Sequence, residues 1–142
     1  MSAEGPYMLE QQVGFLLRKA NQRHRLIFST AVDNEIAPAQ FSALAKLHEI
    51  GGVSQNQLGR LIALDSATIT GVVERLLAAG YVSRQRSPDD ARLRIIELTE
   101  EGRVTIERLL PVADQISKAT LESLSDRDAA TLIRLLEAIA SD

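Results

Sequence analysis

Apolar residues recur at helical spacing along most of this chain. Between residues 8 and 32 they fall three or four positions apart, which predicts one long amphipathic helix. Pro38 suits the first turn of a second helix, and the paired glycines at 51 and 52 suit its end. Both stretches predict helices that bury one face and expose the other.

Two shorter helices are expected next, with a tight turn between them. Ser54 followed three residues later by Gln57 is a capping-box pattern that opens the first of them. Asp65 is the expected cap of the second, whose apolar stripe runs on to Gly80. Two short helices joined by a turn of about three residues predict a helix-turn-helix.

The periodicity changes after Gly80. The segments YVSRQR and LRIIEL each fit a short strand, and the SPDDA between them has proline and aspartate where turns favour them. Thr99 then caps a long helix, which Pro111 is expected to kink or break, and Ser125 opens a last helix. The predicted fold class is mainly α with a small β-hairpin wing, that is, a winged helix-turn-helix.

Composition narrows the chemistry available to the 142 residues. Cysteine is absent and only His24 and His48 offer imidazole nitrogens, so neither a metal site nor a cofactor is expected. No nucleophile–base pair or carboxylate pair stands out, which argues against an enzyme. No apolar run approaches the about 20 residues of a membrane span, and the opening MSAEGPYMLEQQ lacks a secretory pattern. We therefore expect a cytoplasmic protein with no membrane partner.

Charge is distributed unevenly along the chain. The net charge of −3 argues against attraction of the whole protein to nucleic acid. Residues 54–98, however, carry six basic residues against five acidic ones, and all six are arginine. The planar guanidinium fork suits phosphates and base edges. The pattern predicts that one edge of an acidic protein faces double-stranded DNA.

The second helix of the helix-turn-helix is the element expected to enter the major groove. Its early exposed positions carry small or hydroxylated side chains, and Arg75 follows about one turn later. The hairpin tip is expected to place Arg92 in an adjacent minor groove, with Asp90 holding its guanidinium. The candidate DNA-binding residues are Ser54, Gln55, Ser66, Ala67, Thr68, Thr70, Arg75, Arg84, Arg86, Asp90 and Arg92.

The run LGRLIALDSATITGVVERLLAAGYVSRQRSPDDARLRIIELTEEG, residues 58–102, resembles the MarR family of bacterial transcription regulators. The resemblance rests on the threonine-rich recognition helix with its E-R-L, the G-Y-V before the wing, the P-x-D-x-R tip and the L-T-x-x-G exit. Ser87 and Ala91 depart from the family's wing, where an aspartate and a second arginine are frequent. The flanking helices also match, so the resemblance covers essentially the whole chain.

The resemblance implies a single six-helix domain over 1–142 that forms a homodimer. Residues 8–33 and 99–142 would be the helical dimerisation region, and 38–98 the DNA-binding region. The last helix supports this independently, because it has more leucine and isoleucine than one side of a core needs. A two-fold dimer would set two recognition helices about one duplex turn apart, which matches a palindromic operator.

Similar regulators bind small, often aromatic, acids between the dimer helices and the winged helix. The segment QVGFLLRKANQRHRLIF looks like regulators of the breakdown of aromatic or N-heteroaromatic acids, so such a carboxylic acid is the expected effector. An arginine, a histidine and aromatic walls suit a carboxylate on a flat ring. The candidate ligand-binding residues are Arg18, Asn21, His24, Phe41, Ser42 and His48.

Ordinary structural roles fit several of these residues equally well. His24 lies in a polar stretch typical of a solvated surface, His48 is placed to meet the carbonyls at a helix end, and Phe41 suits a core. The expected function is a ligand-released repressor. A winged-helix module that binds protein, and a DNA-binding regulator without an effector, remain as alternatives.

Overall fold

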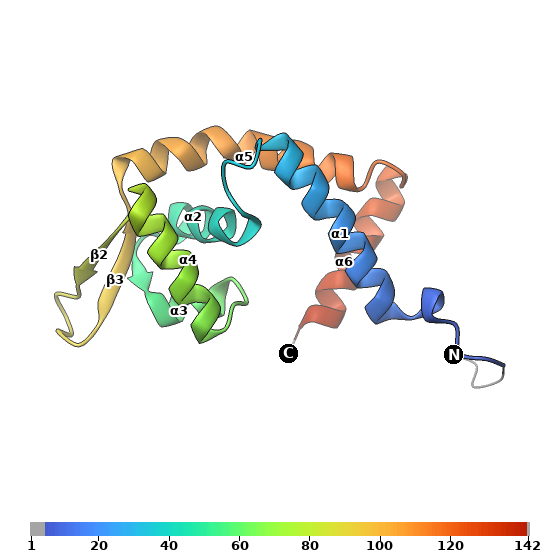
Figure 1. The fold of residues 1–142 in the computed structure, drawn as a ribbon, viewed down its shortest axis with the longest axis horizontal. Coiled ribbons are helices and arrows are strands. Elements are labelled where there is room, and N and C mark those ends of the chain that lie inside the picture. The colour runs from blue at the N-terminus through green and yellow to red at the C-terminus, as the bar shows by residue number, and fades with distance from the viewer. Residues whose placement is uncertain (1–4, 142) are drawn as a thin grey trace.

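The computed structural model describes residues 5–141 and contains six α-helices, one turn of 3₁₀-helix and a three-stranded sheet. The helices are α1 (Val13–Ala31), α2 (Pro38–Ile50), α3 (Gln55–Leu61), α4 (Ser66–Ala79), α5 (Glu100–Thr120) and α6 (Asp126–Ala140). In Figure 1, α5 runs across the top of the molecule and joins two parts of different shape. One is a winged-helix lobe, residues 38–98, and the other is a helical arm made of α1 and α6. The predicted mainly helical, winged helix-turn-helix fold is confirmed.

Four helices begin at the caps that the sequence predicts. In each, a side-chain oxygen accepts a hydrogen bond of 2.7–3.2 Å from the backbone N–H three residues later. The capping residues are Ser54 for α3, Asp65 for α4, Thr99 for α5 and Ser125 for α6. Each bond satisfies a donor that the start of a helix leaves unpaired. Gly80 ends α4 with φ near +81°, in the left-handed region that glycine adopts freely.

The sheet has a strand that the sequence analysis missed. The predicted hairpin is present as β2 (Val82–Arg86) and β3 (Arg94–Leu98), paired antiparallel. A two-residue strand, β1 (Val53–Ser54), pairs with the other edge of β3, giving the order β1-β3-β2. Two residues are too few for alternation to be recognised in a sequence. Through β1, the start of α3 is fixed beside the wing, the β2–β3 hairpin.

The hydrophobic core lies mainly in the winged-helix lobe and under α5. Its most deeply buried side chains are Leu44, Leu58, Ile69, Val73, Leu76, Ile96 and Ile106. Packing is closest where α5 begins, because a Cβ on Gly102 would lie 1.9 Å from the carbonyl oxygen of Tyr81. Only glycine permits this approach, which fixes the exit of the wing against the first turn of α5.

The structure differs from the helix prediction at two points. The first helix does not start near residue 8, because residues 9–11 form a 3₁₀ turn and α1 starts at Val13. The side-chain amide of Gln12 donates instead to the carbonyl of Met8, and no side chain among residues 5–141 caps α1. Pro111 does not break α5, which continues to Thr120. Because Pro111 is exposed, water can hydrate the carbonyl that its missing N–H leaves free.

The helical arm contrasts with the hydrophobic core of the winged-helix lobe. Within the described chain, α6 has no buried residue, although leucine and isoleucine recur along it. Leu135 is 49% exposed and Ile139 is 64% exposed. Figure 1 shows α1 and α6 crossing at the far end of α5, away from the lobe. None of the helices in residues 5–141 has the length and apolar character of a membrane span.

Candidate DNA-binding surface and effector pocket

The first turns of α4 present the predicted small and hydroxylated side chains to solvent. Ser66, Ala67, Thr68 and Thr70 are all exposed, whereas Ile69 between them is buried and anchors the helix. The hydrogen bond from the Thr68 backbone N–H holds the pKa of Asp65 below its usual value. Asp65 therefore stays ionised as the cap, at the helix end that favours negative charge.

Gln55 and Thr70 join the start of α3 to the exposed face of α4. The Nε2 of Gln55 donates to the Thr70 Oγ1 at 3.0 Å, and that hydroxyl donates to the Ser66 carbonyl at 2.8 Å. Both residues were predicted to bind DNA, and the structure brings them into contact. Ser54, another candidate, uses its hydroxyl to cap α3.

Arg75 lies against the surface of its own helix. A Cβ on Gly71 would be 3.4 Å from the Arg75 Nη1, so the guanidinium extends back over a position without a side chain. Arg75 is exposed and takes part in no ion pair among the described residues. Its charge is therefore available to a phosphate or a base on the outer side of α4.

At the tip of the wing, the predicted pairing of Asp90 with Arg92 is present. The Arg92 Nε and Nη2 donate to the two carboxylate oxygens of Asp90, each at 3.2 Å. These bonds hold the pKa of Asp90 below its usual value, while the side chain of Arg92 stays 90% exposed. The Ser87 Oγ accepts from the backbone N–H groups of Asp89 and Asp90, which orders the turn. The wing thus presents an oriented arginine.

The other wing arginines differ in their partners. Arg84 donates to Glu74 of α4 at 2.6 Å, so this predicted DNA contact also ties the wing to the recognition helix. Arg94 donates to the carbonyl of Ala91 at 3.1 Å. Arg86 is exposed, and no ion pair of the described residues includes it.

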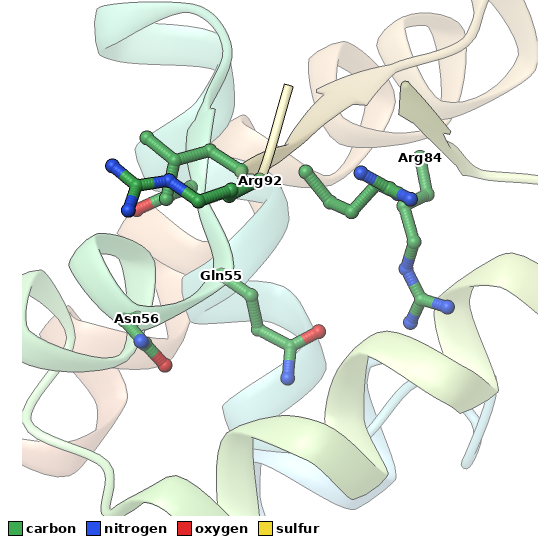
Figure 2. Close-up of a pocket in the computed structure, with 7 residues that line it drawn as sticks. Gln55, Asn56, Arg84 and Arg92 are labelled. Atoms are coloured by element: carbon green, nitrogen blue, oxygen red, sulfur yellow. The ribbon is translucent and has the colours of Figure 1, made fainter. Parts of the chain in front are cut away.

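Wing and helix-turn-helix enclose a shallow hollow of about 410 Å³ (Figure 2). Three arginines reach it from the wing and polar side chains reach it from the start of α3. The lining residues are Ser54, Gln55, Asn56, Arg84, Arg92, Leu93 and Arg94. Sequence reasoning missed Asn56, Leu93 and Arg94, because it did not foresee the β1–β3 pairing that brings α3 to the wing. Of these three, only Arg94 could have been predicted from the sequence, because it is one of the six arginines of residues 54–98.

The six candidate ligand-binding residues do not meet in one cavity of the chain. Asn21 and His24 line a mainly apolar pocket of about 330 Å³ between α1, α5 and α6. The His24 Nδ1 lies 2.9 Å from the Thr120 Oγ1, which itself donates to the Ile116 carbonyl at 2.8 Å. Thr120 must therefore accept from His24, so Nδ1 carries the proton and Nε2 is free to accept in the neutral ring.

The remaining candidates lie elsewhere. Phe41 and Ser42 line a separate hollow on α2, and the Phe41 ring packs edge-on against Phe28 at 5.9 Å. Arg18 is exposed, with its guanidinium 5.5 Å from the ring centre of Phe15.

His48 contacts a carboxylate rather than helix-end carbonyls. Its Nε2 lies 3.1 Å from the Glu107 Oε2 on α5. This contact and a hydrogen bond from Arg103 hold the pKa of Glu107 below its usual value. The pair connects α2 of the lobe to α5. Residues 5–141 contain no group of three histidines or carboxylates able to hold a metal ion.

Known proteins are similar to this chain in both sequence and fold. A family model described as the MarR family matches residues 36–93. The transcriptional repressor NicR of Pseudomonas putida is 42% identical over 132 residues, which are 92% of this chain and 84% of NicR.

Two solved structures are also close to this fold. The structure of Bordetella bronchiseptica BpsR, described for regulation of its DNA binding by 6-hydroxynicotinic acid, is 36% identical with a TM-score of 0.92. That match covers 97% of this chain and 100% of BpsR. The repressor CouR, bound to a 23-mer DNA duplex, is 27% identical with a TM-score of 0.87, covering 99% and 100% of the two chains. The chain therefore belongs to the MarR family of winged helix-turn-helix transcription regulators.

Proposed function

We propose that this protein is a homodimeric repressor that binds a palindromic DNA operator and is released by a small aromatic or N-heteroaromatic carboxylic acid. The observation that carries the proposal is the surface shared by α4 and the wing. Exposed hydroxyls on α4 lie beside a hollow lined by Arg84, Arg92 and Arg94. Hydroxyls and arginines suit base edges and phosphates, which are the two components of duplex recognition.

The helical arm supports the homodimer. An apolar groove of about 310 Å³ runs between α1 and α6 and is lined by Val13, Leu16, Leu17, Ala20, Leu132, Leu135, Leu136 and Ile139. Apolar surface of this extent is costly to leave in water. A second copy offers a surface of the same kind, as a two-fold interface requires. Residues 8–33 and 99–142 are therefore proposed as the dimerisation region.

The pocket between α1, α5 and α6 supports an effector of the proposed class. Its volume of about 330 Å³ suits a single small ring, and leucine and isoleucine make up half of its lining residues. The Nε2 of His24 can accept from a ring hydroxyl or ring N–H. Arg18 does not line the pocket, but it follows Leu17, which does, so its long side chain would have to turn from Phe15 to meet the carboxylate. The relative BpsR agrees with this class, since its structure concerns regulation by 6-hydroxynicotinic acid.

The test is a fluorescence-polarisation titration of operator duplexes selected from a random library, at two salt concentrations and with a panel of aromatic and N-heteroaromatic acids. We expect tight binding that weakens steeply with salt and is relieved by at least one acid. Binding no tighter than to random duplex would contradict the operator, and a response to none of the acids would contradict the effector class.

A second experiment locates the effector pocket. Arg18→Ala and His24→Ala should bind the operator normally and lose release by the acid. Ser42→Ala, in the hollow on α2, should respond like the wild type. A loss of response in Ser42→Ala alone would move the site to α2 and contradict the α1–α5–α6 pocket.

A further inference from the structure

The contact between Gln55 and Thr70 fixes which way the Gln55 amide faces. A threonine hydroxyl has one proton, and the Thr70 hydroxyl donates it to the Ser66 carbonyl at 2.8 Å. Its oxygen can then only accept, which it does from the Gln55 Nε2 at 3.0 Å. The amide nitrogen must therefore face α4, and Figure 2 shows it on that side with the amide oxygen turned away.

Two hydrogen-bonding groups of Gln55 remain available. One N–H of Nε2 is used by Thr70, so among the described residues the second N–H is a free donor and Oε1 is a free acceptor. They form an adjacent donor–acceptor pair beside the exposed face of the recognition helix. Adenine is the base whose major-groove edge offers the complement, an N7 acceptor next to an N6 amino donor. Guanine offers two acceptors there and cannot satisfy Oε1.

A phosphate is a poorer partner for this amide. Phosphate oxygens only accept, so the outward Oε1 would face another acceptor. The surrounding hollow already offers Arg84, Arg92 and Arg94 as phosphate donors. An amide held in one orientation is instead suited to discrimination between bases.

We propose that Gln55 is a specificity-determining residue that reads one adenine in each half-site of the operator, and that Thr70 is the positioning residue that orients its amide. This inference rests on the proposed function and goes beyond it, because it names the base and the two atoms read. It assigns to the start of α3 a part of the base recognition that α4 otherwise provides.

The experiment uses the full-length protein and a selected operator in which each adenine is replaced in turn. One analogue, 7-deazaadenine, removes N7, and the other, purine, removes the N6 amino group. At one position in each half-site, both should weaken wild-type binding about 5- to 150-fold. The same replacements should leave the affinity of Gln55→Ala unchanged, since the contact is already missing. The matched control Gln57→Ala, at an exposed glutamine two residues further along α3, should behave like the wild type.

Thr70→Val separates positioning from folding. Valine keeps the shape and removes the hydroxyl, so discrimination at that adenine should fall in Thr70→Val. In the Gln55→Ala background the same substitution should lower that discrimination no further, because the amide that Thr70 orients is already missing. Equal losses with both analogues in wild type and Gln55→Ala, while the operator is still bound specifically, would overturn only this inference. Failure of the wild type to prefer any sequence over random duplex would overturn the proposed function and the inference together.

Discussion

The winged-helix lobe and the helical arm use similar apolar residues in opposite ways. In the lobe, the leucines and isoleucines of α2, α4 and the sheet are buried against one another. In the arm, α6 repeats the same residue types without burying any of them, and Leu135 is 49% exposed. The lobe therefore completes its own core, whereas the arm has an apolar face that a second chain can cover. We propose that DNA recognition belongs to the lobe, which is complete by itself, and assembly to the arm, which is not.

The largest effect expected is on assembly. Leu135→Lys places a charge in the α1–α6 groove, so it should convert the proposed dimer to a monomer of 15.5 kDa. Leu61→Lys is the matched control, because Leu61 of α3 in the lobe is similarly exposed, at 44%. Sedimentation equilibrium reports both masses. A dimer that survives Leu135→Lys, or a monomer produced by Leu61→Lys, would contradict the assignment of assembly to the arm.

A pair of glycine substitutions compares packing in the two regions. Gly102→Ala should lower the free energy of unfolding by about 3 kcal/mol, since its Cβ meets the Tyr81 carbonyl and the backbone must move. In Gly14→Ala of α1 the new Cβ meets no atom of residues 5–141 within 4 Å, so this substitution should raise the free energy of unfolding by about 0.5–1 kcal/mol through helix propensity. Chemical denaturation measures both. A well-tolerated Gly102→Ala would mean that the wing exit is less tightly packed than described.

The wing arginine is expected to matter only for DNA. Arg92→Ala should weaken operator binding by about 1–3 kcal/mol and leave the melting temperature unchanged, since its side chain contacts only the wing tip. Arg134→Ala on α6 removes the same charge from the arm and should bind normally. Fluorescence polarisation at physiological salt gives both affinities. Equal losses of affinity in the two variants would mean that Arg92 acts only through its charge and not through its place on the wing.

The smallest effect expected concerns the cap of α4. Because Asp65 has a lowered pKa in the folded protein, its ionised form stabilises the fold above its ordinary pKa of 3.8. That stabilisation is lost as the pH falls through the lowered value. Asp65→Ala should therefore have a lower melting temperature than the wild type at pH 7, and the difference between the two melting temperatures should narrow below about pH 4. A gap that stays constant with pH would exclude the carboxylate charge as its cause.

Features that are local in the chain could be predicted from the sequence. The caps of α3 to α6 involve residues three apart, and the pairing of Asp90 with Arg92 involves residues two apart. The helix-turn-helix and the wing likewise follow from spacing and turn residues. Short sequence separation leaves few conformations to consider, so the pattern nearly determines the contact.

Contacts between distant segments could not be predicted in this way. His24 meets Thr120 across 96 positions, and Gln55 meets Thr70 only because the turn before α4 brings the two helices together. The sequence also grouped Phe41 with His24, whereas the structure separates them onto α2 and the α1–α5–α6 pocket. Residue chemistry identified these side chains, and tertiary packing decided which of them share a site.

The most direct test of the account compares a palindromic operator with a single half-site. Two lobes joined through the arm should bind the palindrome about 100- to 10,000-fold more tightly than the half-site, because the second lobe binds at high effective concentration. Leu135→Lys should bind both duplexes with the same affinity as the wild type binds the half-site. Equal affinity of the wild-type protein for palindrome and half-site would contradict the division between a recognition lobe and an assembly arm.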